Sequence, residues 1–256
     1  VPPNIIDQKS TLQSQLALVW GTGKQIWLNE SGVRVLNLPR EQLPDCSADP
    51  DEQAAYVIQA HVYGLCSGIS KHFHHQLYDD GGDGDDAYGP KVFGLVDNSN
   101  APRPAYTAYQ LAAGYLNGVE IKSCPSHPKP QGGYQMASFY RPATQEWVRV
   151  LWSVAENSVV APVPAYGTSA KLIYQNGAEE TITPVDGWYS VNLEAATTFG
   201  RHPSVSPMIG GKPVIFIENG PSEPPTPTPT PSPSPTPTET PIPTPIPTPV
   251  PTPEVG

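Results

Sequence analysis

The order of its expected helices and strands constrains this chain more than any other feature of the sequence. Residues 7 to 20 carry apolar side chains at helical spacing, which predicts a helix. A short apolar run, 26 to 28, follows between glycines and leads into Glu30. A run this short predicts a buried strand between helices, with Glu30 at its carboxyl end.

The next elements repeat this alternation. Asp49, Pro50 and Glu52 match the cap, first residue and third residue of a helix start with a capping box, and apolar residues continue the helix to about residue 68. A strand is predicted over 69 to 77 and a third helix over 105 to 116. The order helix, strand, helix, strand, helix is typical of parallel βα units.

After residue 119 the pattern changes to short runs with alternating apolar and polar residues, separated by turn signals. This half predicts an antiparallel sheet or β-sandwich of about 100 residues. The expected strands are 146 to 155, 170 to 174, 188 to 193 and 213 to 218. Asn176-Gly177 and Asp186-Gly187 are the expected turns.

Proline dominates the carboxyl-terminal segment. Residues 221 to 256 hold 16 of the 34 prolines, alternating with threonine, serine or isoleucine. Such a segment cannot form a hydrogen-bonded core, so we expect a disordered, extended linker or stalk of the kind found outside cells. The expected domains are therefore 1–118, 119–220 and the linker 221–256.

The net charge of −10 restricts the class of partner. Three of the negative charges are tail glutamates, which leaves −7 for the folded part. An acidic body without a basic stripe argues against nucleic acid as a partner. No apolar run is long enough for a transmembrane segment, and no secretory signal opens the chain. The chain begins as though within a longer protein, and we expect an upstream part.

Three cysteines, Cys46, Cys66 and Cys124, stand at unrelated spacings. They predict neither a disulfide framework nor a zinc ligand set, and their pairing stays open. Cys66 lies inside a predicted helix and is expected to be a buried packing residue. The tail, more than the cysteines, indicates an extracellular or cell-surface location.

Several blocks of sequence together resemble a known family. The runs KQIWLNESG, DEQAAYVIQAHVYGLCSGISKHF and FGLVDNSNAPRPAYTAYQ, in this order, are similar to the last quarter of the retaining (β/α)₈ glycoside hydrolases. The later runs VRVLWS, YSVNL and IGGKPVIFIENG resemble the accessory β-sandwich that often follows such barrels. The resemblance covers residues 5 to 219. It implies an α/β plus all-β chain, with the last βα units of an incomplete TIM-type barrel followed by an antiparallel sandwich.

The resemblance implies a role for Glu30. In this clan the nucleophilic glutamate ends the seventh strand, the position that Glu30 matches. A retaining glycosidase needs a second carboxyl group about 5 Å away as acid/base. No stretch here matches the acid/base, so the chain alone is expected to be catalytically incomplete. The pair Asn29-Glu30 also resembles the Asn-Glu pair that carries the clan's acid/base, but the downstream order, a single strand and helix before the sandwich, favours the nucleophile role for Glu30.

Substrate contacts are expected beside this glutamate. Asn29 precedes it, and His74 and His75 stand where the clan usually has an aromatic residue at the end of strand eight. The resemblance implies a carbohydrate substrate and no cofactor. A second reading is a non-catalytic cell-surface or glycan-binding protein on a degenerate glycosidase scaffold. An upstream Asn-Glu pair ending a fourth strand would distinguish the two.

Two groups of residues have some of the features of a metal site. His72 and His74, two apart on a strand, share one face, as two zinc ligands of a metal-dependent hydrolase do. His61, His127 and the aspartates would have to complete that site, and none has a recognisable spacing. Aspartates between residues 79 and 86 resemble a calcium loop, but Gly81 and Pro90 occupy ligand positions. We therefore expect no metal site and a solvated acidic loop.

The tryptophans are expected to serve packing. If strand alternation holds, Trp27 points away from the side of Glu30 and packs against helices. In the β half, Trp147, Trp152 and Trp188 are predicted to be core and cross-strand residues and not a strip for carbohydrate.

Overall fold

The computed structural model describes residues 24–79, 85–86, 89–90, 92–125, 132–202 and 207–221. The chain divides into two compact units, 1–224 and 225–256, and every described residue belongs to the first. The expected helix over 7 to 20, His127 and the tail beyond Pro221 lie outside the described residues. In the part of the chain that is described, no helix has the length and apolar character needed to cross a membrane.

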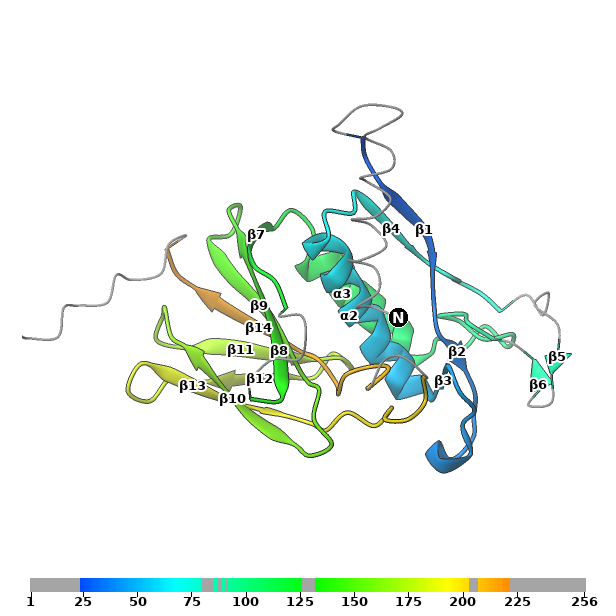
Figure 1. Cartoon of the computed structure of the whole chain (residues 1–256). Helices are drawn as coiled ribbons and strands as arrows, with labels where there is room; N and C mark the ends of the chain where they lie inside the picture. Colours follow the sequence, from blue (N-terminus) through cyan, green and yellow to red (C-terminus); the bar gives the residue numbers. More distant parts are fainter. Residues whose placement is uncertain are drawn as a thin grey trace, which may run out of the picture. The chain divides into compact units, whose positions relative to one another are not determined.

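The described residues form two α-helices, one short 3₁₀ helix and a set of strands (Figure 1). In chain order the elements are β1 (Trp27–Ser31), β2 (Arg34–Val35), η1 (Arg40–Gln42), β3 (Ser47–Ala48), α2 (Pro50–Cys66), β4 (Lys71–His74), β5 (Asp85–Asp86), β6 (Gly89–Pro90), α3 (Pro104–Tyr115), β7 (Glu120–Ser123), β8 (Tyr134–Arg141), β9 (Glu146–Ser153), β10 (Val159–Pro164), β11 (Ala170–Tyr174), β12 (Glu179–Ile182), β13 (Trp188–Leu193) and β14 (Val214–Asn219).

Helix α2 begins as its sequence predicts. The Asp49 carboxylate accepts a hydrogen bond from the Glu52 amide at 2.8 Å, and Glu52 accepts one from the Asp49 amide at 2.9 Å. This reciprocal pair satisfies two amides that a helix start otherwise leaves unpaired, and Pro50 fits the first position because it has no amide hydrogen to place. The helix ends before Gly68, whose φ of 69° is a conformation that glycine adopts at little cost.

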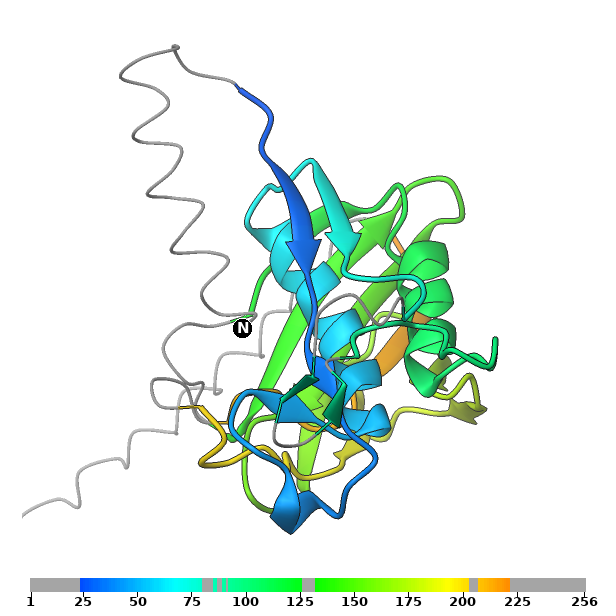
Figure 2. The ribbon, with the colours of Figure 1, turned by 90° about the vertical axis from the view of Figure 1, so that its right-hand side faces the viewer.

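The two predicted strands of the first half pair in parallel. β1 and β4 form a two-stranded sheet, as the βα order predicts. Helices α2 and α3 lie between this pair and the large antiparallel sheet, as Figures 1 and 2 show from two directions. A loop after α2, and not a strand, fills residues 69 and 70, so β4 is shorter than the predicted strand.

The second half contains two antiparallel sheets. The larger sheet has six strands in the order β12-β11-β14-β9-β8-β7, and the smaller one pairs β10 with β13. Side chains from β9, β11 and β14 on one face of the large sheet share a core with β10 and β13. Side chains on its opposite face share another core with α2 and α3. The large sheet is therefore covered on both faces.

This double coverage changes the pattern that the sequence suggested for β9. Alternating strands are half-buried, whereas every residue of β9 after its first is buried. Its two faces meet different partners, with Val148 and Val150 toward the helices and Leu151 toward the smaller sheet. A strand buried on both faces needs no polar alternation.

The predicted turns and two of the strand bounds are confirmed. β11 and β13 begin and end where the alternation predicts. Gly177 has a φ of 85°, and Asp186 and Gly187 have φ values of 50° and 80°, which are left-handed conformations that hairpin turns require. In this half, the sequence did not single out β7, β8, β10 or β12 as strands.

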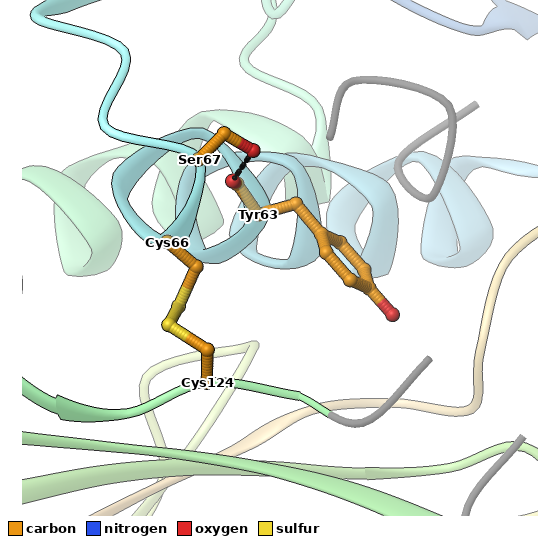
Figure 3. The surroundings of a disulfide bond; sticks show 4 residues. All are labelled: Tyr63, Cys66, Ser67 and Cys124. Atoms are coloured by element: carbon orange, nitrogen blue, oxygen red, sulfur yellow. Dashed lines mark hydrogen bonds between the residues drawn. A yellow bond between two sulfur atoms is a disulfide. The ribbon is translucent and has the colours of Figure 1, made fainter. Parts of the chain in front are cut away.

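A disulfide corrects the expectation that Cys66 is a simple packing residue. Cys66, the last residue of α2, is bonded to Cys124, which directly follows β7 (Figure 3). The two Cα atoms are 5.7 Å apart, although 58 positions separate the residues in the chain. Spacing alone could not reveal this pair, because the helix and the strand meet only after folding. Cys46 is free and exposed.

Glu52 also connects α2 to the loop after β13. Its carboxylate accepts hydrogen bonds from both terminal nitrogens of Arg201, at 2.6 and 2.9 Å, and from the Thr197 hydroxyl at 2.5 Å. Glu52 and Arg201 are both buried. A bidentate pair of this kind fixes both position and orientation, so the start of α2 is attached to the β half.

Glu218 plays the corresponding part inside the large sheet. This buried carboxylate accepts hydrogen bonds from Arg149 at 3.0 Å, the Tyr189 hydroxyl at 2.9 Å and the amides of Tyr166 and Gly167 at 2.8 and 2.6 Å. Arg149 is itself 1% exposed and has the Tyr166 ring 4.3 Å from its guanidinium carbon. Four donors compensate the charge that folding removes from water.

Candidate functional site

Glu30 lies near the carboxyl end of β1, where the sequence analysis placed it. Its side chain is exposed and has no hydrogen bond or ion pair with any residue that the structure describes. β1 runs parallel to β4, so the carboxyl ends of both strands meet at one edge of the pair. That edge is where parallel α/β architectures place their reactive groups.

The pairing of β1 with β4 is irregular at Asn29 and Glu30. Leu28 lies opposite His72, and Ser31 lies opposite His74. Two residues therefore lie between these positions on β1, but only one on β4. Such a bulge re-aims side chains and is frequent beside active sites. Here Leu28 and Ser31 are half-buried, whereas Asn29 and Glu30 are both exposed.

The expectation that Trp27 packs against helices was wrong, because α2 packs against the opposite face of the strand pair, the face of His72 and His74. Regular alternation would separate Trp27 from Glu30 and bury it against helices, but Trp27 is 55% exposed. Its ring lies 6.4 Å from the ring of Phe73, and the Lys71 ammonium stands 4.9 Å from its centre. Phe73 is 46% exposed. The face of the strand pair that α2 does not cover therefore carries two exposed aromatic rings beside the Lys71 ammonium.

The two strands approach closely just beyond Glu30. The His75 amide donates to the Ser31 carbonyl at 2.9 Å, and a Cβ on Gly32 would overlap the His75 carbonyl oxygen. Only glycine fits there without moving the backbone. The peptide bond between His75 and Gln76 is cis, and the His75 ring lies 5.4 Å from the ring of Phe93. Asn29 is therefore next to Glu30 in the chain, and His75 lies near it on the neighbouring strand segment.

His72 and His74 share one face, as predicted, and that face is the one packed against α2. The His72 ring lies 4.6 Å from the His61 ring, and its Nε2 is 2.5 Å from the Ser31 hydroxyl oxygen. The His74 ring lies 6.5 Å from the Tyr56 ring. His74 thus contacts the helix, and its expected contact with substrate stays a prediction.

Burial controls the charge of these histidines. Burial, together with the neighbouring His61 and His74 rings, lowers the pKa of His72 to about 3. Burial also lowers the pKa of His74 to about 4, against the opposing effect of a hydrogen bond to the backbone at Phe93. The pKa of His61 is lowered by burial too. At neutral pH the cluster is uncharged, because a low-dielectric contact disfavours the protonated rings.

No group of three or more metal-ligating side chains occurs among the residues that the structure describes. Asp79 was expected in a solvated acidic loop, but it is 2% exposed and accepts hydrogen bonds from Arg103 at 2.6 Å and from the Gly94 amide at 2.7 Å. An ion pair with Arg103 requires no metal. The remaining aspartates of that segment are outside the described residues or have no described side chain.

The tryptophans of the β half divide into two groups. Trp147 and Trp152 are 3% and 1% exposed, which confirms the prediction that they are core residues. Trp188 is 52% exposed, so it is not a core residue, although it has the predicted position opposite a residue of a neighbouring strand. Trp188 begins β13 and lies opposite Pro164 on the outer face of the smaller sheet, where no further layer covers it among the described residues.

Some residues that build the site were not singled out from the sequence. Ser31 contacts His72, and Tyr56 contacts His74 from the helix side. His61, which the sequence analysis named only as a possible metal ligand, packs beside His72. The sequence held a signal for His61, because it follows Val57 by four positions on the face of α2 that packs inward. In the structure its Nδ1 lies 2.8 Å from the Val57 carbonyl oxygen. The Ser31 contact depends on the bulge, which cannot be predicted from the local sequence pattern.

Comparison with known proteins identifies the fold. No family model and no curated protein matches the chain. Similar solved structures include a family 39 glycoside hydrolase from Bacteroides cellulosilyticus, with a TM-score of 0.54 and 17% identity over 82% of this chain and 37% of that chain. The family 51 α-L-arabinofuranosidase of Thermotoga petrophila has a TM-score of 0.53 and 10% identity over 85% of this chain and 48% of that one.

A further α-L-arabinofuranosidase, from Thermotoga maritima, has a TM-score of 0.52 and 12% identity over 84% of this chain and 48% of its own. At such identities the likeness is one of fold, and this chain spans less than half the length of each of the three. The predicted resemblance to barrel glycoside hydrolases is confirmed at that level.

Proposed function

We propose that this chain supplies the last two strands and the accessory β region of a retaining glycoside hydrolase, with Glu30 as its nucleophile. The observation that carries the proposal is the placement of Glu30: an exposed carboxylate, at a bulge, near the carboxyl end of a parallel strand pair. The fold likeness to solved glycoside hydrolases supports this reading.

The chemistry requires a second carboxyl group. Glu30 would attack the anomeric carbon while a carboxylic acid gives its proton to the leaving oxygen, so that the glycosidic bond breaks and a glycosyl ester on Glu30 forms. Water, deprotonated by the same second group, then displaces Glu30 and releases the sugar. The proposal assigns this acid/base to a barrel strand other than β1 and β4. The short coverage of the similar structures supports that assignment.

Asn29 and His75 are the proposed contacts for sugar hydroxyls, because both lie beside the bulge that carries Glu30. His74 would support them from behind, through its contact with α2. The domain boundary near residue 118 is part of the same proposal, in which 1–118 belongs to the barrel and 119–220 to the accessory region. The two share a core in the described structure.

We also propose an extracellular or cell-surface location. The Cys66–Cys124 disulfide supports it, because disulfides persist mainly in oxidising compartments. The proline-rich segment 221–256 supports it as a spacer to a surface or another module.

The test uses the natural protein that carries this chain. Incubation with 2-deoxy-2-fluoro glycosides that have a good leaving group should trap a covalent sugar on the peptide containing Glu30, as read by mass spectrometry. Glu30→Ala should reduce kcat by about 10³-fold or more, since the step it removes is covalent, and added azide should restore turnover. Glu41→Gln, a change at another exposed glutamate, is the matched control. A label on any other residue, or full turnover in Glu30→Ala, contradicts the assignment.

The alternative of a non-catalytic glycan-binding protein is favoured by one observation. Where the glycosidase clan usually carries an aromatic wall, this chain has His74 and His75, and His74 contacts the helix behind the strand. A protein of this kind would bind glycans without releasing sugar and would form no covalent adduct with any fluoro-glycoside.

A further inference from the structure

A second candidate site lies away from Glu30, where the start of α2 meets the β half. It is a pocket of about 180 Å³ formed by the first turn of α2, the β11–β12 turn, the end of β13 and the start of β14, elements that are labelled in Figure 1. Drug-sized ligands occupy pockets of about 300–1,000 Å³. This pocket therefore has room for one small ring and not for a long ligand.

Gln175 provides the feature that points to a ligand. It lines the pocket, is 5% exposed, and donates from its Nε2 to the Asp51 carbonyl at 3.1 Å. Its Oε1 is buried and accepts no hydrogen bond from any described residue. A buried amide oxygen without a donor destabilises the folded state, and such groups in native proteins call for an explanation. A ligand hydroxyl would supply the missing donor once the side chains that cover this oxygen moved aside.

The rest of the lining has mixed polar and apolar character. Asn192, exposed near the end of β13, adds another amide that can both donate and accept. The ring of Tyr174 is held by donation of its hydroxyl to Glu180 at 2.6 Å, and Pro213 adds apolar surface. Amide groups beside a fixed aromatic ring match a sugar, which has hydroxyls on its edge and C–H groups on its faces.

The charges at the mouth compensate one another. The Lys212 ammonium lies 3.3 Å from carboxylate oxygens of both Asp51 and Glu194. Lys212 thus already occupies the position between the two carboxylates that a cation would take. Because its charged groups are paired, the pocket suits an uncharged ligand better than an ionic one.

We propose that this pocket binds a single ring of a neutral saccharide, with Gln175 and Asn192 as its hydrogen-bonding residues. Such a site would hold glycan on the accessory half of the protein and does not involve Glu30. It is independent of the proposed catalytic function, and it would serve a hydrolase or a glycan-binding protein equally.

Saturation-transfer NMR of the full chain tests the proposal with glucose, galactose, xylose and arabinose as neutral probes, and glucosamine and glucuronic acid as charged comparators. We expect transfer to at least one neutral sugar, and a Kd about tenfold weaker in Asn192→Ala, the loss that one hydrogen bond typically causes. Ser190→Ala is the matched control, because Ser190 is exposed on the same face of β13 and does not line the pocket. It should bind as the unchanged chain does.

A second variant separates a ligand contact from a structural one. Gln175→Met removes the unpaired oxygen at similar volume but also the Nε2 donor to the Asp51 carbonyl, so binding should be lost while the two opposing effects change the melting temperature by only a few degrees. Glu30→Gln should keep full binding, which distinguishes this site from the proposed nucleophile. The proposal is overturned if no neutral sugar at about 10 mM gives transfer, since a site with a Kd near 1 mM would be occupied. It is also overturned if only glucosamine or glucuronic acid binds, or if Asn192→Ala and Ser190→Ala bind alike.

Discussion

The β1–β4 pair and the six-stranded sheet are built under opposite conditions. The large sheet is covered by helices on one face and by β10 and β13 on the other, and its central strand β9 is buried almost throughout. Among the described residues, the β1–β4 pair is covered by α2 on one face, and Trp27 and Phe73 are exposed on the other. Parallel strands in proteins are almost always covered on both faces.

The strand pair that carries the proposed functional residue is therefore not the part of the molecule that contributes most to stability. Two strands alone are marginally stable, so β1 and β4 depend on contacts with α2 and with whatever covers their aromatic face. The same two strands carry Glu30 and the bulge. In the proposed barrel, other elements would cover the aromatic face and supply the second carboxyl group. The large sheet packs against α2 through the shared core.

The largest effect is expected inside the large sheet. Glu218→Ala leaves Arg149 buried without its partner and removes the acceptor of Tyr189, which should lower the free energy of unfolding by about 3–5 kcal/mol. Urea denaturation followed by circular dichroism measures the change. Glu156→Ala, at an exposed loop glutamate, should change stability by less than about 0.5 kcal/mol. Equal effects of the two would show that the sheet does not depend on this carboxylate.

The next effect concerns the covalent connection between the two regions. The Cys66–Cys124 bond joins the helix behind β4 to the strand β7 of the large sheet. Replacing both cysteines by alanine should cost about 2–4 kcal/mol, because the unfolded chain is released from a long loop. Cys46→Ala, at the free cysteine, is the control and should melt as the unchanged chain does. Melting temperature measured with and without a reducing agent checks both.

Acid should weaken the contact between α2 and the strand pair. His72 and His74 have pKa values of about 3 and 4 in the folded state, below the usual value of about 6.5. Above pH 6.5 the rings are neutral in both states and contribute no pH dependence. As the pH falls from about 6.5 toward 4, the unfolded chain binds protons that the folded chain excludes, so each histidine should lower stability by about 1.4 kcal/mol per pH unit.

The corresponding measurement is the free energy of unfolding at several pH values between 7 and 4.5. His72→Leu removes one titrating ring, so its curve should be flatter than that of the unchanged chain. Ser31→Ala removes the hydroxyl that contacts His72 but keeps every titrating ring, and its curve should be shifted downward and keep its slope. A parallel shift for His72→Leu would show that burial of this ring does not cause the acid sensitivity.

Local chemistry predicted the elements whose causes are local. The capping box of Asp49 and Glu52, the glycine turns and the ends of β11 and β13 depend on neighbours in the sequence, and the structure confirms them. The full burial of β9 was not predictable, because it depends on helices that come earlier in the chain. The Cys66–Cys124 pair has the same origin in distant contacts.

At the site, the position of Glu30 near a strand end was predictable from a short apolar run. Its surroundings were not. The register between β1 and β4 is irregular at Asn29 and Glu30. Helix α2 packs against the face that carries His72 and His74, so Trp27 lies on the other face. The bulge and the packing of α2 are tertiary properties.

The smallest change in stability is expected on the aromatic face of the strand pair. Trp27→Ser and Phe73→Ser alter exposed side chains and should each change the free energy of unfolding by less than about 0.5 kcal/mol. Yet an uncovered apolar face binds hydrophobic dyes and promotes self-association, so the double variant should bind less of a naphthalene-sulfonate dye. Trp188→Ser is the control, because Trp188 is as exposed as Trp27 but belongs to the antiparallel β10–β13 pair. If dye binding falls equally in the control, exposure alone attracts the dye. A selective fall at Trp27 and Phe73 would instead identify the β1–β4 face as a surface that requires a cover.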